Sequence, residues 1–101
     1  MSQNHSLHLK LIKRDLYLNG NRQPIRLRPK EAQLLAALLR YPNQVVSRAT
    51  LMHEVWQTDY LDDTRTLEVH IHGLRQKIED NPARPRRIVT ARGVGYCLVT
   101  D

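Results

Sequence analysis

The chain has 101 residues, with sixteen Lys and Arg against ten Asp and Glu, a formal net charge of +6 and a pI near 10.0. A chain of this length forms one domain and buries roughly 60 to 70% of its unfolded surface without cross-links. The single cysteine, Cys97, excludes an internal disulfide, which suits a reducing cytosol, and no apolar run reaches the ~20 residues of a membrane span. The charge favours a polyanionic partner, nucleic acid before an anionic membrane.

The N-terminal part of the chain predicts a short tail and a small sheet. Residues 1–6 lack the apolar segment of a secretory signal and predict a disordered tail, and residues 7–101 predict the folded domain. Leucines alternate with polar residues over 7–11 and again over 16–18, which is typical of half-buried strands. Asn19-Gly20 is a strong hairpin signal, so we expect an antiparallel sheet that ends near residues 25–27.

Two helices with a short strand between them follow. Pro29 predicts the first position of a helix whose leucine stripe, at positions 34, 35, 38 and 39, ends before Tyr41-Pro42-Asn43. Val45 and Val46 predict a short strand. Ser47 then predicts the cap of a second helix. The expected buried side of this second helix carries Leu51, Met52, Val55 and Trp56.

Residues 64–79, TRTLEVHIHGLRQKIE, predict a third helix with two unlike faces. At about 100° per residue, one narrow arc collects the apolar residues Leu67, Ile71, Leu74 and Ile78, which predicts core. Either Asp63 or Thr64 could cap this helix. A solvated face would mix acids and bases more evenly, so we expect the polar face to lie against a partner. The arc opposite the core holds Arg65, Val69, His72 and Gln76.

The end of the chain predicts a basic hairpin. Two β-rich runs surround Arg92-Gly93-Val94-Gly95, and the two glycines permit the positive φ angles of a tight turn. Residues 84–92 contain four arginines and no acid, whereas Asp59, Asp62 and Asp63 gather before the third helix. The order sheet, helix, strand, helix, helix, hairpin predicts an α+β fold, a winged helix-turn-helix.

At this point the sequence resembles the DNA-binding effector domain of the OmpR/PhoB family of bacterial response regulators. The resemblance covers the chain from about Leu7 to Val99 and rests on several motifs in the same order. They are Val46-Ser47-Arg48, Leu51 with Val55-Trp56, Arg65-Thr66-Leu67-Glu68-Val69-His70-Ile71, Leu74-Arg75-Gln76-Lys77-Ile78, Pro85, Ile88, Thr90 and Arg92-Gly93-Val94-Gly95-Tyr96.

The resemblance implies an N-terminal four-stranded antiparallel sheet, three helices and a C-terminal β-hairpin wing. It implies that the third helix enters the major groove of DNA and that the wing reaches the adjacent minor groove. It also implies contact with RNA polymerase through the acidic loop between the second and third helices. That loop is formed by Gln57, Thr58, Asp59, Tyr60, Leu61, Asp62 and Asp63.

Family members usually carry a receiver domain that a sensor kinase phosphorylates, and 101 residues cannot hold both domains. We therefore expect an excised effector domain, or a standalone protein, located in bacterial cytoplasm at the nucleoid. The resemblance implies tandem direct-repeat half-sites on double-stranded DNA. The domain alone should be monomeric and pair only on DNA.

Reach and charge assign the candidate DNA contacts. Arg65 can bind a phosphate or a guanine edge, Val69 a thymine methyl, and His72 and Gln76 base edges. The major-groove candidates are Arg65, Thr66, Val69, His70, His72, Gly73, Arg75, Gln76 and Lys77; the wing candidates are Thr90, Arg92, Gly93 and Tyr96; the DNA-backbone candidates are Arg48, Trp56, Arg86 and Arg87.

Two positions depart from the family pattern. Arg28 precedes Pro29 where the family usually has a threonine that caps the first helix, so the cap is missing or supplied otherwise. Gly73 replaces a residue that is commonly an arginine contacting DNA, so base reading must depend on its neighbours. The glycine could instead let the helix backbone approach the DNA closely.

Other classes of function are weakly supported. His70 and His72 form an HxH pair whose rings diverge on a helix, so we expect no metal, and no cofactor motif is complete. Ser47, His53 and Asp59 are the residue types of a hydrolase triad, but nothing predicts that they converge, and we expect no enzyme. The alternative from another class is a winged helix whose third helix docks a partner protein, which Val69 and Gly73 would suit.

Overall fold

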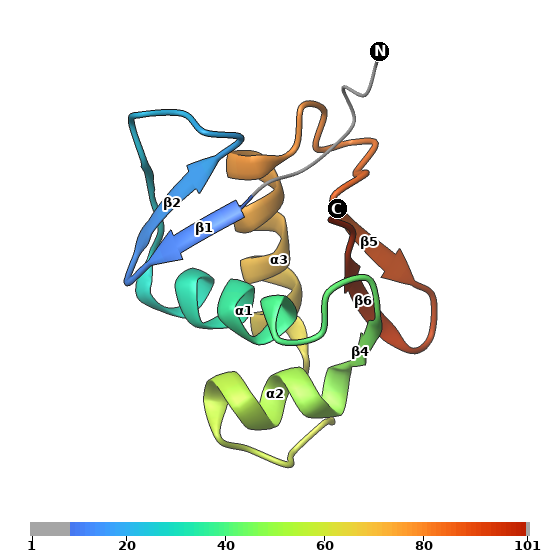
Figure 1. Ribbon diagram of the computed structural model, residues 1–101. Coiled ribbons are helices and arrows are strands. Elements are labelled where there is room, and N and C mark those ends of the chain that lie inside the picture. The colour runs from blue at the N-terminus through green and yellow to red at the C-terminus, as the bar shows by residue number, and fades with distance from the viewer. Residues whose placement is uncertain (1–8, 101) are drawn as a thin grey trace.

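The computed structural model describes residues 9–100, so the tail predicted at 1–6 lies outside the described residues. Figure 1 shows a sheet at the N-terminal end, three helices and a second sheet at the C-terminal end. The elements are β1 (Leu9–Ile12), β2 (Asp15–Leu18), β3 (Ile25–Arg26), α1 (Pro29–Leu39), β4 (Val45–Ser47), α2 (Arg48–Trp56), α3 (Arg65–Ile78), β5 (Ile88–Ala91) and β6 (Gly95–Leu98).

The N-terminal sheet has the order β1-β2-β3, and both of its pairings are antiparallel. Asn19 and Gly20 have φ angles of 51° and 77°, and the Asn21 N–H donates to the Leu18 carbonyl at 2.9 Å. The predicted turn is therefore present. Pairing of β2 with β3 nevertheless begins only at Leu16 and Ile25, so a longer loop than a two-residue hairpin joins these strands.

The prediction of a four-stranded N-terminal sheet is wrong for residues 9–100, where this sheet has three strands. Between β2 and β3, only the segment 19–24 is available for a further strand. It begins with the turn at Asn19 and Gly20 and ends at Pro24, which has no N–H to donate to a ladder. The segment consequently forms loop.

Helix α1 begins at Pro29 without a side-chain cap from Arg28, because an arginine side chain has no acceptor. Glu31 supplies the cap from the other direction: its Oε1 accepts a hydrogen bond from the Arg28 backbone N–H at 2.9 Å. The missing threonine is thus replaced by the carboxylate half of a capping box.

Helices α2 and α3 begin as the sequence predicts. Ser47 caps α2, since its Oγ accepts from the Thr50 N–H at 3.1 Å. Thr64 occupies the cap position of α3 but makes no cap bond; the Asp63 carboxylate accepts from the Arg65 N–H at 3.0 Å instead. With 14 residues, α3 is about 21 Å long.

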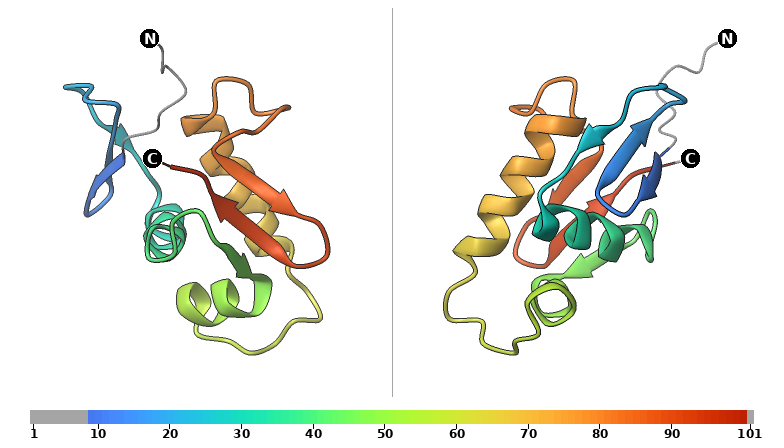
Figure 2. Two further views of the ribbon diagram at one scale, coloured as in Figure 1. Left: turned by 45° about the vertical axis from the view of Figure 1, so that its right-hand side comes forward. Right: turned by 90° about the vertical axis from the view of Figure 1, so that its left-hand side faces the viewer.

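The C-terminal sheet has the order β4-β6-β5, so the predicted short strand joins the predicted hairpin. Gly95 makes this junction possible, because a Cβ at that position would lie 1.9 Å from the Val46 carbonyl oxygen. Figure 2 shows α1 between the N-terminal sheet and the C-terminal sheet, with α3 packed alongside the latter. The α2–α3 loop lies at the far end from the N-terminal sheet.

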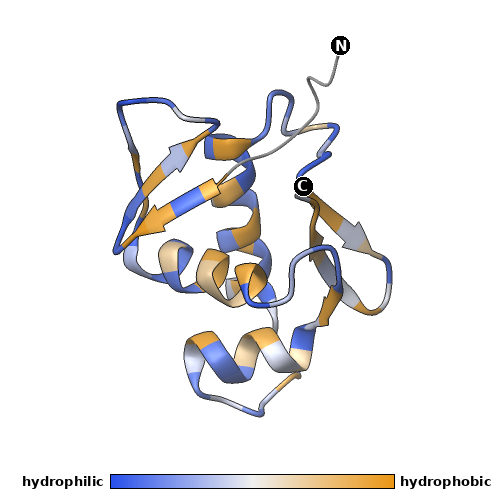
Figure 3. Ribbon diagram, viewed as in Figure 1, coloured by the Kyte–Doolittle hydropathy of each residue, from blue (hydrophilic) through white to orange (hydrophobic). Residues whose placement is uncertain are grey.

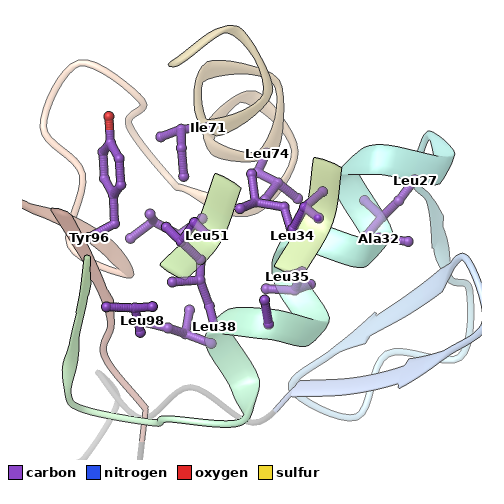
Figure 4. Close-up of a cluster of buried hydrophobic side chains, with 14 of the residues drawn as sticks. Leu27, Ala32, Leu34, Leu35, Leu38, Leu51, Ile71, Leu74, Tyr96 and Leu98 are labelled. Atoms are coloured by element: carbon purple, nitrogen blue, oxygen red, sulfur yellow. The ribbon is translucent and has the colours of Figure 1, made fainter. Parts of the chain in front are cut away.

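The core lies where α1, α2, α3 and β6 meet, as Figure 4 shows with leucines from all three helices pointing toward one another. In Figure 3 hydrophobic residues recur along α1 and α3, while the loop from α3 to β5 is mostly hydrophilic. The predicted buried arc of α3 is confirmed: Leu67, Ile71, Leu74 and Ile78 are at most 1% exposed. Burial on this arc fixes which face of α3 remains outside. None of the helices within 9–100 has the length and apolar character that crossing a membrane requires.

Candidate nucleic-acid interface

The outer face of α3 carries a stripe that we call the reading stripe, formed by Arg65, Val69, His72 and Gln76. All four residues are exposed, and 63% of Val69 remains accessible. At about 100° per residue these positions fall within one 60° arc opposite the buried leucines and isoleucines. A major groove about 12 Å wide admits a helix with such a stripe toward the base edges.

Asp63 holds the first residue of the reading stripe. Its carboxylate accepts hydrogen bonds from Arg65 Nη2 at 2.8 Å and from Arg65 Nε at 3.1 Å. The side-chain hydrogen bond from Arg65, followed by the bond from its backbone N–H, lowers the pKa of Asp63 to about 2. The same pairing raises the pKa of Arg65. The exposed Asp63 and Arg65 side chains therefore form an ion pair at neutral pH.

Lys77 and Gly73 lie on the shoulder of α3 that faces α1. Lys77 Nζ donates to Glu31 Oε1 at 2.6 Å, and Glu31 is only 3% exposed. A Cβ at position 73 would lie 2.4 Å from Glu31 Oε2. The space that Gly73 leaves is thus occupied by the Glu31 carboxylate, and its predicted close approach to DNA, like the DNA contact of Lys77, stays a prediction.

Arg75 lies on the other shoulder and is tied to the wing. Its guanidinium donates to the Ile88 carbonyl at 2.8 and 3.0 Å and to Thr90 Oγ1 at 2.8 Å. It also lies over the Tyr96 ring, 5.7 Å from the centroid. Arg75 and Thr90 therefore join α3 to β5, and Tyr96, which is 4% exposed, belongs to the core. Their DNA contacts remain untested predictions.

The N-terminal half of α3 packs on the end of α2 through aromatic rings. His70 and Trp56 meet edge to face with ring centroids 5.2 Å apart, and both side chains are half-buried. His70 Nδ1 lies 2.7 Å from the carbonyl oxygen of Thr66 one turn earlier, which fits an Nδ1–H donor. The half-buried Thr66 is thus part of the same packed edge.

The wing turn is open to solvent. Gly93 has a φ of 77°, as the predicted turn requires, and Arg92 is exposed and makes no hydrogen bond or ion pair with any residue of 9–100. Val94, which the sequence reasoning did not single out, is 53% exposed at the same turn, while its carbonyl accepts from the Arg48 N–H at 3.1 Å. The sequence does carry a signal for Val94, because it is an apolar residue between two glycines.

The DNA-backbone candidates differ in how far protein groups already bind their side chains. Arg48 pairs with Glu68 at 3.0 Å and lies over Tyr96. Arg87 donates to the Ile78 carbonyl and approaches Asp80 at 3.8 Å, so it fastens the foot of the hairpin to α3. The exposed Arg86 donates its backbone N–H to Glu79 at 3.0 Å, as does Arg87 at 3.1 Å.

The acidic loop, residues 57–63, presents two large apolar side chains: Tyr60 is 63% exposed and Leu61 45%. Gln57 begins it in the left-handed conformation, with a φ of 53°, and the Thr58 hydroxyl accepts from the Tyr60 N–H. Asp62 is exposed and makes no bond within the described chain.

The residue types of a hydrolase triad do not assemble into a relay. His53 Nδ1 lies 3.0 Å from the Asp59 carboxylate, an approach that sequence reasoning did not predict. The Ser47 hydroxyl instead accepts a hydrogen bond from the Thr50 N–H and donates one to the Thr50 hydroxyl. Ser47 therefore serves as a helix cap.

Comparison with known proteins decides the family. The family described as transcriptional regulatory protein, C terminal, matches residues 22–98. The chain belongs to this family. It is a winged-helix DNA-binding domain of the OmpR/PhoB response regulators, a class of transcriptional regulators and not of enzymes.

This OmpR/PhoB domain is similar to curated regulators over part of their length. It is 49% identical over 78 residues to the sensory transduction protein RegX3 of Mycolicibacterium smegmatis, covering 77% of this chain and 34% of that protein. It is 40% identical over 90 residues to the alkaline phosphatase synthesis transcriptional regulatory protein SphR of Synechococcus elongatus, covering 89% and 35%. The chain thus spans about a third of the length of these relatives.

Solved structures share the same fold. The DNA-binding domain of Klebsiella pneumoniae RstA, in complex with the RstA box, matches with a TM-score of 0.78 at 29% identity, covering 93% of this chain and 91% of that one. The C-terminal domain of the nisin resistance regulator NsrR matches with a TM-score of 0.71 at 36% identity, covering 92% and 93%.

Proposed function

We propose that this domain binds double-stranded DNA by sequence, with the reading stripe of α3 in the major groove and Arg92 of the wing in the adjacent minor groove. One observation carries the proposal: the reading stripe lies opposite the buried arc of α3 and is left uncovered by every other described element. The RstA domain that shares this fold is in complex with DNA in its crystal structure.

The chemistry of the reading stripe assigns a role to three of its four members. Val69 offers an apolar surface to a thymine methyl, and Gln76 can pair with the N6 and N7 atoms of adenine. His72 between them can donate to a base acceptor or accept from a base amine. These uncharged groups select bases and add little to non-specific attraction.

The electrostatic part of the DNA affinity then comes mainly from basic residues outside the reading stripe. Arg92 has no protein partner within residues 9–100, and a narrow A·T-rich minor groove concentrates the negative potential that attracts such a side chain. Lys77, Arg75 and Arg87 are already held by protein acceptors. The wing and its neighbourhood therefore carry most of the salt-sensitive contacts.

We further propose that the whole regulator acts in transcription through contacts beyond DNA. The acidic loop exposes Tyr60 and Leu61 beside Asp59 and Asp62, a combination that fits a basic polymerase surface with an apolar pocket. The domain pairs on tandem direct-repeat half-sites and is a monomer alone, while a sensor kinase acts through a receiver domain outside this chain.

A second candidate function is docking of a partner protein on α3, which the 63% exposure of Val69 favours. Electrophoretic mobility shift on a duplex selected from a random library separates the two. DNA binding predicts retardation whose log K falls with log salt at a slope of roughly −4 if about four phosphates are neutralised. A docking module would give no salt-sensitive retardation, and that result would overturn the DNA proposal.

A further inference from the structure

We propose that Asp63 is a positioning residue that holds Arg65 for bidentate recognition of a guanine through its O6 and N7 atoms. The inference rests on the proposed function, because it requires the reading stripe to lie in the major groove. It adds a base identity and a specificity-determining acid to that function.

The geometry of the pair carries the inference. Asp63 takes the side edge of the Arg65 guanidinium, Nε and Nη2, at 3.1 and 2.8 Å. A guanidinium has five N–H donors in a fixed plane. The end edge, formed by one Nη1–H and the second Nη2–H, makes no bond within the described chain, and the side chain is 85% exposed. That edge matches the two acceptors of guanine in the major groove.

The placement of Arg65 favours a base over a phosphate. Arg65 shares its narrow arc with Val69, His72 and Gln76, directly opposite the buried arc, whereas phosphates lie beside the flanks of a helix in the groove. A phosphate contact would also lose strength from the adjacent carboxylate, which cancels part of the guanidinium charge. A base contact gains from that carboxylate, because the orientation of the planar fork is fixed before binding.

Asp63 is anchored independently of the guanidinium, so it can serve as a fixed support. Its Oδ1 also accepts the Arg65 backbone N–H at 3.0 Å, which ties the carboxylate to the start of α3. The neighbouring Asp62 is exposed and makes no such bond. Two adjacent acids of equal charge thus differ in their contact with Arg65, which supplies a matched control.

The test uses duplexes selected from a random library by the protein itself, with each guanine replaced in turn by 7-deazaguanine, which removes N7. For the wild-type protein we expect one guanine whose replacement weakens binding about tenfold. Arg65→Ala should abolish that penalty and Asp63→Asn should reduce it to less than about threefold. Asp62→Asn, with the same change in net charge, should retain it in full. Thermal unfolding of each variant establishes that it is folded; asparagine at 63 still offers an acceptor to the Arg65 N–H.

The possible outcomes are distinguishable. If the wild-type protein binds a selected sequence but no guanine penalty depends on Arg65, or if Asp63→Asn keeps the full penalty, the inference is overturned and the DNA-binding proposal stands. An Arg65→Ala variant that loses the same factor of affinity on every duplex would assign Arg65 to a phosphate and also overturn it. Failure of the wild-type protein to select any sequence would overturn the proposed function itself.

Discussion

The carboxylate of Glu31 in α1 accepts a hydrogen bond from Lys77 of α3, with Nζ and Oε1 2.6 Å apart. The same oxygen accepts the Arg28 N–H, and the other carboxylate oxygen faces Gly73. One almost fully buried acid therefore caps α1 and fixes the rotation of α3 about its axis. Rotation matters for function because it decides which residues of α3 face outward.

Replacing Lys77 by methionine should destabilise the domain by about 1 to 3 kcal/mol, because a buried carboxylate loses its charged partner. Glu31→Gln in the same background should recover part of that loss. Urea denaturation at pH 7 of the two single variants and the double variant checks this. Additive effects of the two substitutions would contradict the pairing.

The Glu31 pair also predicts a pH dependence. Burial raises the pKa of Glu31, but the hydrogen bonds from Lys77 and from the Arg28 N–H outweigh it, so the pKa lies below its ordinary value. Its contribution to stability is therefore present above the unfolded pKa of about 4.3 and is lost as the pH falls through the lower folded value. The free energy of unfolding lost in Glu31→Gln should be largest near pH 7 and shrink below about pH 4. An equal loss at both pH values would show that Glu31 acts through packing alone.

Gly73→Ala should destabilise the domain in spite of alanine's higher helix propensity, which alone would add about 1 kcal/mol. The new Cβ would lie 2.4 Å from Glu31 Oε2, and that carboxylate is held at its other oxygen by two donors. Thermal denaturation should show a lowered midpoint in the wild-type background. With Glu31→Ala the same substitution should become stabilising; a lowered midpoint there too would contradict this explanation.

Arg75→Ala should loosen the wing without removing a phosphate contact. The guanidinium links α3 to the Ile88 carbonyl and the Thr90 hydroxyl. Hydrogen exchange of the β5 and β6 amides should accelerate in the variant. DNA affinity should fall while the slope of log K against log salt stays within experimental scatter of the wild-type value. A slope that becomes shallower by about one unit would mean that Arg75 neutralises a phosphate.

Arg92→Ala should have effects opposite to those of Arg75→Ala: stability should be retained and the salt slope should change. The side chain is exposed and unpaired within 9–100, so its removal should leave the unfolding free energy within about 0.5 kcal/mol of wild type. The salt slope should become shallower by about one unit if the wing lies in a minor groove. Arg84→Ala, which removes an exposed arginine from the loop between α3 and β5, is the control, and equal effects of both variants would remove the special role of Arg92.

Sequence alone predicted much of the fold because its strongest patterns are local. The 3.6-residue period of α3, the Ser47 cap and the glycines of the wing each specify their own conformation without help from distant residues. The four-stranded sheet was implied by family resemblance, whereas residues 9–100 form three strands at this end, with 19–24 as a loop between β2 and β3. The union of β4 with β6 depends on Gly95 approaching Val46, a contact between segments about 50 residues apart.

The site was less predictable than the fold, because charge in a sequence does not reveal whether it is already paired. Lys77 and Arg75 have the right chemistry and lie on the right helix, yet Glu31 and the Ile88 carbonyl take their hydrogen bonds. These partners lie 46 and 13 residues away, outside any local motif. Arg65, by contrast, meets its partner two residues away, a pairing that inspection of the sequence could have found.

We propose above that the reading stripe of α3, together with the wing turn, faces DNA. Titration of the isotopically labelled domain with a selected duplex, followed by amide chemical shifts, tests it most directly. We predict that Arg65, Val69, His72, Gln76 and the wing turn at 92–94 shift together, while the N-terminal sheet and residues 57–61 of the acidic loop stay unchanged. Shifts confined to Tyr60, Leu61 or the N-terminal sheet, with the stripe unmoved, would contradict it.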